Sequence, residues 1–433
     1  MTRLIAMVSE FQSGERWLAT RRLAGVMMRY TLSALGPMSI AGAHFIASLI
    51  FLHGFSTGAF GIFSFVLVIV VPFALSSCGA LLNAPLARAA HMEGARDEAL
   101  AVYFKASLVF AVIAAVCGGG LLLASGADAR LDVILAVYCG TMTMRWFARC
   151  HAYTVHHPLQ AVASDLAYSV FLVGALSALY TTQSLSENHA GAAMFAASLL
   201  GLAAFGWSFV RPLLASLKQG ALSGYRIVWR DLTRWSLLGV VSTELTMNAH
   251  AYLVTFIFGP KSFALLAVGS LFMRPVSLAL TALPDLERPI MARHVANGNV
   301  SHAWRAVKEF RTAAGAVWLA TLVLAAMILI WFPSLLLKPE YDVTQVIVVI
   351  ALWATIMAVR TMRTPESVLL QAAGEFRTLA MPSVWSSLVS VGATLALLLA
   401  FGPIASLAGI LIGDLVMTTN VLALTRRWRA VRA

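Results

Sequence analysis

The chain consists of about twelve apolar spans of roughly twenty residues, and its lysines and arginines are sorted between the gaps that separate these spans. All but four of the 31 lysines and arginines fall in every second gap, at the span ends that border these gaps, or in the two terminal segments. Arg130, Lys261 and Lys338 lie in the opposite gaps, and Arg274 lies inside a span. Because cations collect in the cytoplasmic loops of membrane proteins, this pattern predicts a multi-pass membrane protein with both termini in the cytoplasm.

Each span is expected to be a helix, because a chain that crosses lipid must satisfy its backbone hydrogen bonds within itself. The expected spans are 30–54, 59–82, 101–126, 130–150, 159–182, 190–213, 234–258, 262–284, 311–333, 343–363, 379–402 and 405–425. The gaps between them are too short to fold alone. The activity of the protein is therefore expected within the membrane.

The composition excludes a water-soluble globule. Hydrophobic residues make up 60% of the chain and charged residues 12%, against about a quarter charged in soluble domains. The net charge of +12 is explained by cytoplasmic loops beside anionic headgroups, so we expect no nucleic-acid partner. The four cysteines lack CxxC spacing, which predicts neither a disulfide framework nor a metal site.

An internal repeat relates the two halves of the chain. A shift of 203 residues places Phe55, Phe60, Pro72 and Leu75 on Phe258, Phe263, Pro275 and Leu278. Six spans separate the copies, so both halves should have the same orientation, related by a pseudo-two-fold axis along the membrane normal. This predicts an all-α protein of two six-helix lobes around a central cavity, which is the architecture of an alternating-access transporter.

The expected organisation follows from the spans and the repeat. It comprises a cytoplasmic N-terminal segment at 1–29, a six-helix lobe at 30–213, a cytoplasmic linker at 214–233, a second six-helix lobe at 234–425 and a basic tail at 426–433. The segment 1–29 mixes bulky apolar residues with arginines, which favours an amphipathic helix on the membrane surface. A disordered tail is the alternative.

Several diffuse motifs carry a resemblance to a known family. They are the Gly-rich turn GFSTGAFGIFSF, the prolines of spans two and eight, the loop RPIMARHVANG with AWRAVKEFRTA, and LLQAAGEFRTLA. With these motifs the chain resembles the polysaccharide-transport branch of the flippase superfamily that also contains the lipid II flippases and the multidrug and toxin extruders.

The resemblance covers nearly the whole chain and implies a function. Such a protein moves an undecaprenyl-pyrophosphate-linked oligosaccharide from the cytoplasmic to the periplasmic leaflet of the bacterial inner membrane, for O-antigen or exopolysaccharide assembly. It is a transporter and not an enzyme. Its implied partners are the lipid-linked glycan, membrane lipids and the glycan polymerase and export machinery.

Three arginines are candidates for binding the pyrophosphate. Arg274 is the strongest, because the repeat places Val71 at the matching position of the first lobe, so a cation was added to one copy only. Alternatively, the guanidinium of Arg274 reaches the cytoplasmic membrane interface, or a neighbouring carboxylate neutralises it. Arg29 and Arg145 extend the basic surface at the cytoplasmic mouth, or else are ordinary positive-inside anchors.

Glu244 and Asn248 are candidates for ion coupling. They are four residues apart in span seven and so share one helical face. Oxygen ligands suit Na⁺, and a buried carboxylate suits H⁺, so coupling to either ion is expected rather than any larger cofactor. The alternative is an ion pair between Glu244 and Arg274 on adjacent helices.

Other polar residues inside spans are candidates for the lining of the cavity. Asp165 and Asp414 are acidic residues within spans five and twelve. Asp165 either serves the ion pathway, or hydrogen-bonds Tyr168 or pairs with Arg145. His44 and His250 lie in the middle of spans one and seven. Each either relays protons or contacts sugar, or is a buried neutral imidazole bonded to a neighbour.

Three other classes of protein were weighed. A cation-coupled multidrug or small-solute extruder has the same fold but favours an acidic cavity. The one charged residue that occurs in only one copy of the repeat, Arg274, is basic. A membrane-embedded glycan polymerase or ligase needs a sizeable outside loop with catalytic arginines or histidines, and the outside loops are short. A permease of the major-facilitator type is expected to carry a basic motif that NAPLARAAHMEGARDEAL lacks.

Overall fold

The computed structural model describes residues 35–432 except 90–95, 127, 156, 219–220, 336 and 338–339. Arg29 and the rest of the N-terminal segment lie outside the described residues. The first lobe begins with a helix over Leu35–Gly54. Its second helix is interrupted and consists of α2 (Thr57–Phe65), the π-helix η1 (Val66–Val70) and α3 (Val71–Ala89). The other helices of the lobe are α4 (Arg96–Ala124), α5 (Ala129–Thr154), α6 (Pro158–Thr181) and α7 (Glu187–Ala203).

The second lobe repeats this plan. It contains α10 (Arg234–Phe258), the pair α11 (Pro260–Phe272) and α12 (Arg274–Ala296), α13 (Val300–Trp331), η4 (Pro333–Leu335), α14 (Val343–Ala372), α15 (Phe376–Phe401), η5 (Pro403–Ala405) and α16 (Ser406–Arg432). The linker between the lobes contains α8 (Trp207–Ser216), η2 (Leu222–Gly224), α9 (Tyr225–Val228) and the π-helix η3 (Trp229–Thr233).

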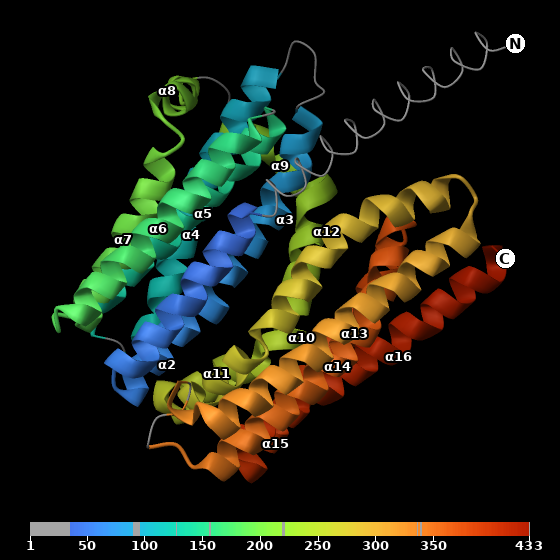
Figure 1. Cartoon of the computed structure of the whole chain (residues 1–433). Coiled ribbons are helices and arrows are strands. Elements are labelled where there is room, and N and C mark those ends of the chain that lie inside the picture. The colour runs from blue at the N-terminus through green and yellow to red at the C-terminus, as the bar shows by residue number, and fades with distance from the viewer. Residues whose placement is uncertain are drawn as a thin grey trace, which may run out of the picture.

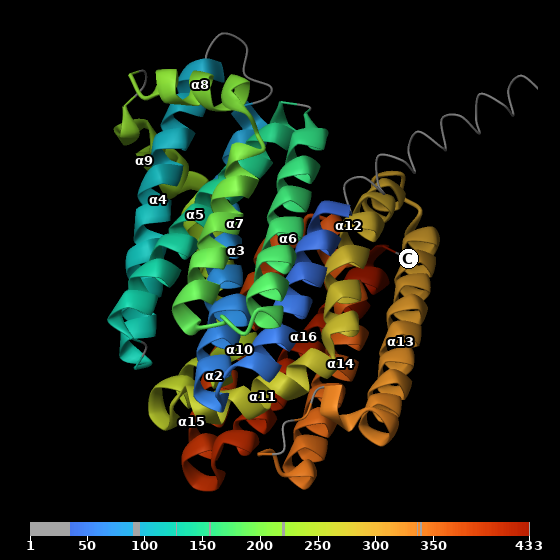
Figure 2. The same cartoon turned by 60° about the vertical axis from the view of Figure 1, so that its left-hand side comes forward.

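The predicted all-α architecture of twelve long helices in two lobes is confirmed. Within the described residues, eight helices are long and apolar enough to span a membrane, and the bent α11–α12 pair makes a ninth. The remaining three, α5, α7 and α10, run alongside them in the two bundles (Figures 1 and 2).

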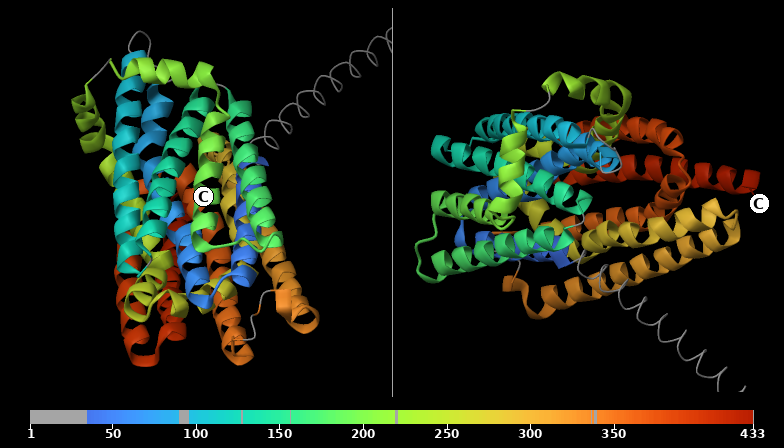
Figure 3. Two further views of the ribbon diagram at one scale, coloured as in Figure 1. Left: turned by 90° about the vertical axis from the view of Figure 1, so that its left-hand side faces the viewer. Right: turned by 90° about the horizontal axis from the view of Figure 1, so that it is seen from above.

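The two lobes meet at one end of the molecule and spread apart towards the other (Figure 1). We call the first the seal end, where α2 contacts α11, and the second the linker end, where α8 and the C-terminus lie. Figure 3 shows the two bundles from the side and from above. The C-terminal ends of α3, α5, α7, α12 and α14, which precede the gaps that hold the sorted cations, all lie at the linker end.

Local sequence explains where helices begin at the seal end. Side-chain oxygens cap the first turns of α2, α5, α7 and α14, and satisfy backbone N–H groups that have no partner within the helix. The capping residues are Ser56, Asp128, Ser186 and Asp342. Gly259 and Gly402 have positive φ angles of 84° and 87°, which glycine adopts readily. Each is followed by a proline that starts the next helix, so two turns of the second lobe have the same Gly-Pro sequence and conformation.

The repeat predicted from the sequence coincides with a break in the same helix of each lobe. In the first lobe, the π-helix Val66–Val70 interrupts the helix just before Val71 and Pro72. In the second lobe, α11 and α12 are bent by 62° at Met273, just before Arg274 and Pro275. Proline lacks the N–H that continues a helix, which accounts for a break at both places.

Two expected boundaries were wrong in a way that affects the site. α5 continues to Thr154 and α14 to Ala372, beyond the expected ends at 150 and 363, because polar residues inside the helices were taken as their ends. The sixth expected span, 190–213, is instead two helices, since α7 ends at Ala203 and α8 begins at Trp207.

Candidate functional site

The seal end is closed by direct contact between the lobes. Gly61 of α2 faces Pro260 at the start of α11 so closely that a Cβ on Gly61 would lie 2.0 Å from the Pro260 carbonyl oxygen. Phe65 of α2 packs edge-on against Tyr252 of α10 and Phe263 of α11, with ring centroids 5.7 and 6.0 Å apart. These buried apolar contacts exclude water from this end.

Two polar contacts reinforce the closure at the seal end. His53 Nε2 lies 3.0 Å from the carbonyl oxygen of Ser334, in η4. The Thr57 hydroxyl donates a hydrogen bond to the Glu340 carboxylate. His53 and Thr57 belong to the first lobe and their partners to the loop between α13 and α14. We call these two bonds the latch.

A buried cluster of two arginines and one aspartate lies inside the first lobe. Arg145 Nη2 of α5 is 2.6 Å from Asp165 Oδ1 of α6, and Arg149 Nη1 is 3.1 Å from Asp165 Oδ2. Arg145 Nε also donates to the Ser164 hydroxyl at 3.1 Å. The side chains of Arg145 and Asp165 are 3% and 2% exposed, so the cluster carries a net positive charge within the lobe.

Glycines make room for this cluster. A Cβ on Gly36 of the first long helix would lie 2.2 Å from Asp165 Oδ2, and a Cβ on Gly201 of α7 would lie 2.7 Å from Arg145 Nε. Small residues therefore let two further helices approach the ion pair closely, as is usual in membrane bundles. Four helices of the lobe are joined at this point.

A chain of hydrogen bonds leads from the cluster to His44. The guanidinium of Arg145 lies over the Tyr168 ring at 4.4 Å. The Tyr168 hydroxyl is 2.7 Å from His44 Nε2 and 2.8 Å from the Tyr138 hydroxyl. His44 is therefore a buried histidine bonded to a neighbour, which was one of the two interpretations of the sequence.

The second lobe contains a cluster of the same composition. Arg360 Nε of α14 is 2.7 Å from Asp414 Oδ2 of α16, and Arg363 Nη1 is 2.8 Å from Asp414 Oδ1. Arg360 Nη2 also donates to the carbonyl oxygen of Met247 at 3.4 Å, which joins α10 to the cluster. Asp414 is fully buried.

The two clusters are related by the repeat, but only in part. α5 and α14 are the fourth long helices of their lobes, so both arginine pairs occupy equivalent elements. The carboxylate comes from the fifth helix in the first lobe and from the sixth in the second. Asp414 accepts a hydrogen bond from an arginine on each of its oxygens, whereas Asp165 accepts one on Oδ1 and lies only within ion-pair distance of Arg149 on Oδ2. Pairing with an arginine lowers the cost of a carboxylate in a membrane interior.

Arg274 differs from these paired arginines. It begins α12 at the bend, its Nε is buried without an acceptor, and no carboxylate pairs with it among the described residues. The alternative of a pair with Glu244 is not what the structure shows.

Glu244 instead belongs to a polar group on α10. Its Oε1 accepts a hydrogen bond from the Tyr252 hydroxyl at 2.9 Å, and Asn248 lies one turn further along the same helix. The shared helical face of Glu244 and Asn248 is therefore confirmed, whereas their role in ion coupling stays a prediction. No group of three metal-ligating side chains occurs within the described ranges.

His250 lies among aromatic rings on α10. Its ring centroid is 5.4 Å from that of Trp353 and 6.3 Å from that of Phe263, and it is 1% exposed. The Trp353 indole donates to the carbonyl oxygen of Leu266 at 3.1 Å, which fixes α14 against α11. The surroundings of His250 are those of a packing residue near the α11 helix.

Sequence reasoning missed the second cluster. Arg149, Arg360 and Arg363 were assigned to cytoplasmic gaps with the other sorted cations, but they lie inside α5 and α14. The signal that identifies them is a pair of arginines three or four residues apart near the end of a span, together with a lone aspartate in a later span of the same lobe.

Comparison with known proteins identifies the fold. No family profile and no curated protein sequence matches the chain. Solved structures do match: an inward-facing multidrug resistance MATE family transporter of the MOP superfamily aligns with a TM-score of 0.71 and 14% identity, over 93% of this chain and 98% of that one. The chain has the fold of the MATE transporters.

Two further structures give the same result. An outward-facing multidrug resistance MATE family transporter aligns with a TM-score of 0.62 and 15% identity, over 93% of this chain and 95% of that one. A MOP superfamily transporter from Pyrococcus furiosus, described as having a binding pocket of reverse polarity, aligns with a TM-score of 0.61 and 16% identity, over 93% and 95%.

Proposed function

We propose that the protein moves an undecaprenyl-pyrophosphate-linked oligosaccharide from the cytoplasmic to the periplasmic leaflet of a bacterial inner membrane. Transport would occur by alternating access, in which the two lobes rock about their contact. The MATE fold supports a transporter of this kind, and the sorted cations support a cytoplasmic linker end. The described arrangement then corresponds to an inward-facing state.

The observation that carries the proposal is the unpaired cation Arg274. Arg274 is partly exposed, but its Nε is buried without an acceptor, which is costly in a membrane protein unless a ligand supplies the anion. The guanidinium presents several donors in a planar fork that fits phosphate oxygens. A pyrophosphate that enters from the linker end would supply the missing acceptor.

The position of Arg274 would couple the substrate to the motion of the lobes. It lies at the 62° bend between α11 and α12, and α11 forms the lobe contact with α2 at the seal end. A ligand that pairs with Arg274 would act on the bend directly. The paired clusters around Asp165 and Asp414 would hold each lobe rigid while this bend changes.

A cation-coupled multidrug extruder is the second candidate, and Glu244 favours it. The MATE structures named above are described as multidrug resistance transporters. Glu244 is a partly buried carboxylate that accepts a hydrogen bond from the neutral Tyr252 and has no ion pair among the described residues. Such a carboxylate could bind an organic cation, Na⁺ or H⁺.

The two candidates are distinguished by a transport assay on the purified protein in liposomes. One set of vesicles receives a fluorescent polyprenyl-pyrophosphate-linked oligosaccharide in a single leaflet, and another receives a fluorescent organic cation. We expect translocation of the lipid-linked oligosaccharide and no accumulation of the cation. Transport of the cation without translocation of the oligosaccharide would overturn the proposal in favour of the extruder. A neutral polyprenol bearing the same sugar is the control for the pyrophosphate.

A further inference from the structure

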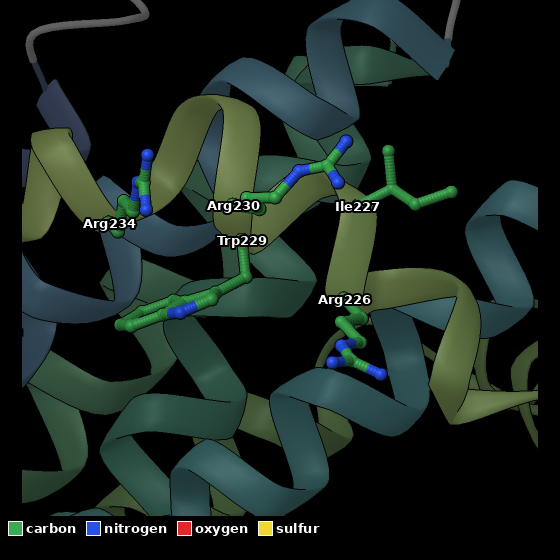
Figure 4. Close-up of a pocket in the computed structure, with 5 residues that line it drawn as sticks. All are labelled: Arg226, Ile227, Trp229, Arg230 and Arg234. Atoms are coloured by element: carbon green, nitrogen blue, oxygen red, sulfur yellow. The ribbon is translucent and has the colours of Figure 1, made fainter.

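The linker between the lobes contains a basic groove on the surface of the first lobe. The groove has a volume of 470 Å³ and is lined by Arg226, Ile227, Trp229, Arg230 and Arg234 (Figure 4). This volume is in the range of about 300–1,000 Å³ that is usual for small-ligand sites. The three arginines are spaced four residues apart along α9, η3 and the start of α10, and all three are exposed.

A second groove, which is apolar, adjoins the basic one. It has a volume of 260 Å³ and is lined by Ala106, Val109, Phe110, Leu222, Tyr225, Arg226 and Trp229. Arg226 and Trp229 line both grooves, so the two are continuous. Val109 on α4 is 41% exposed and Leu222 is 44% exposed, which leaves the apolar groove open on the outer side of α4.

The segment that forms the grooves is fixed to the first lobe. The Tyr225 hydroxyl donates to the carbonyl oxygen of Leu81 at 2.7 Å, and the Tyr225 ring packs edge-on against Phe110 and Tyr103. Tyr225 is 8% exposed, so it anchors α9 between α3 and α4. The grooves are therefore part of the fold and do not depend on a loosely attached loop.

Arginines outnumber acidic residues in the segment that forms the basic groove. Asp231 is the only acidic residue in 221–234, and its carboxylate accepts from Arg230 Nε at 2.7 Å. Hydrogen bonding from Arg230 lowers the pKa of Asp231, so this aspartate stays ionised and offsets one arginine of the three. A net positive charge remains beside the apolar groove.

We propose that these joined grooves bind one anionic phospholipid of the leaflet at the linker end. The headgroup phosphate lies among Arg226, Arg230 and Arg234, and an acyl chain follows the apolar groove past Val109 and Leu222. The Trp229 ring lies at the boundary between the two parts, as aromatic residues do at the headgroup level. Basic residues beside a spanning helix attract anionic lipids, and the adjacent apolar groove selects a lipid over a soluble anion.

The site is separate from the proposed transport pathway. It is built by the linker and the outer side of α4, whereas Arg274 lies at the α11–α12 bend. The linker connects α7 with α10, so a bound lipid would tie the connection between the lobes to α4 and to the membrane surface. This inference does not rest on the identity of the transported substrate.

Native mass spectrometry of the full-length protein in detergent tests the site. The probes are phosphatidylglycerol, phosphatidylcholine with the same acyl chains, and glycerophosphoglycerol, which is the headgroup without chains. We expect wild-type protein to bind phosphatidylglycerol at least about tenfold more tightly than either of the others. Equal binding of phosphatidylcholine, or equal binding of the free headgroup, would overturn the proposal.

Variants locate the lipid on the protein. The triple variant R226Q/R230Q/R234Q should lose the preference for phosphatidylglycerol, whereas R426Q/R427Q/R429Q at the end of α16, which removes the same number of arginines, should retain it. Val109→Trp fills the apolar groove and should also weaken binding, whereas Val112→Trp on the same helix, away from the groove, should not. Binding that is lost equally in both triple variants, or retained in R226Q/R230Q/R234Q, would show that the lipid binds elsewhere. Because no transport is measured, failure here is independent of failure of the proposed function.

Discussion

Gly61 of α2 lies against Pro260 of α11 so closely that an added Cβ would come within 2.0 Å of the Pro260 carbonyl oxygen and 2.6 Å of its carbonyl carbon. The two residues belong to different lobes, so this backbone approach is a point at which the lobes touch. Backbone atoms cannot move aside as a flexible side chain can. The contact should therefore control whether the seal end closes.

The first prediction is that Gly61→Ala impairs closure of the seal end. A glycine-to-alanine change in a helix normally stabilises the helix by about 1 kcal/mol, so any loss of function reflects the contact with Pro260. Gly58→Ala, one turn earlier in α2 and with no atom within 4 Å of its added Cβ, is the matched control. Transport in liposomes should fall in G61A and stay at the wild-type level in G58A. Equal activity of the two variants would refute the importance of the contact.

The second prediction concerns the two buried clusters. Asp165→Asn or Asp414→Asn leaves one buried and one partly buried arginine without a carboxylate, and breaking a buried ion pair in this way costs about 3–5 kcal/mol. Both variants should unfold at clearly lower temperature in detergent. Asp97→Asn, at an exposed position in the first turn of α4, should unfold as the wild type does. Unchanged unfolding temperatures of D165N and D414N would show that the clusters do not stabilise the lobes.

The third prediction concerns the hydrogen bonds of Tyr168. Tyr168→Phe removes the hydroxyl that contacts both His44 and Tyr138, and leaves two buried polar groups without that partner. The loss should be about 1–3 kcal/mol of stability. Tyr180→Phe on the same helix removes a hydroxyl from a side chain that is 45% exposed and should cost almost nothing. Thermal unfolding of the two variants in parallel measures the difference.

The fourth prediction concerns the latch. Glu340→Ala removes the acceptor of the Thr57 hydroxyl and should weaken closure of the seal end, so that the lobes spend more time closed at the linker end. Spin labels at Asp97→Cys on α4 and Ser301→Cys on α13, with Cys117 replaced by serine, report the separation of the lobes there. A population at shorter distance should grow in E340A. Glu187→Ala in the first turn of α7, also at the seal end, should leave the distances unchanged. No difference between the two variants would show that the latch does not bias the lobes.

Much of the fold could be predicted from the sequence, because membrane insertion leaves a strong signal. The apolar spans and the sorted cations gave the number of long helices and the ends at which their loops lie. The repeat that pairs Pro72 with Pro275 also located the break that both lobes share. The spans and the sorted cations depend on local composition, and the shared break depends on the internal repeat of the sequence.

The candidate site was less predictable, because its pairs depend on packing between helices far apart in the chain. Arg360 and Asp414 are 54 residues apart and meet only when α14 lies against α16. Both arginines of each cluster also lie near the ends of the apolar spans expected from the sequence, so charge sorting makes them look like ordinary cytoplasmic anchors, although the helices continue beyond them. Arg145 with Asp165 was anticipated as one alternative, whereas the pairing of Arg274 with Glu244 was not found.

The most direct test of the proposed function is the translocation of a polyprenyl-pyrophosphate-linked oligosaccharide by Arg274 variants in liposomes. We predict that Arg274→Ala abolishes translocation while the protein remains folded and membrane-inserted, and that Arg274→Lys retains part of it because the charge is kept without the planar fork. Arg130→Gln, at an exposed position in the first turn of α5, should translocate as the wild type does. Translocation by R274A at the wild-type rate would contradict the assignment of this arginine to the pyrophosphate.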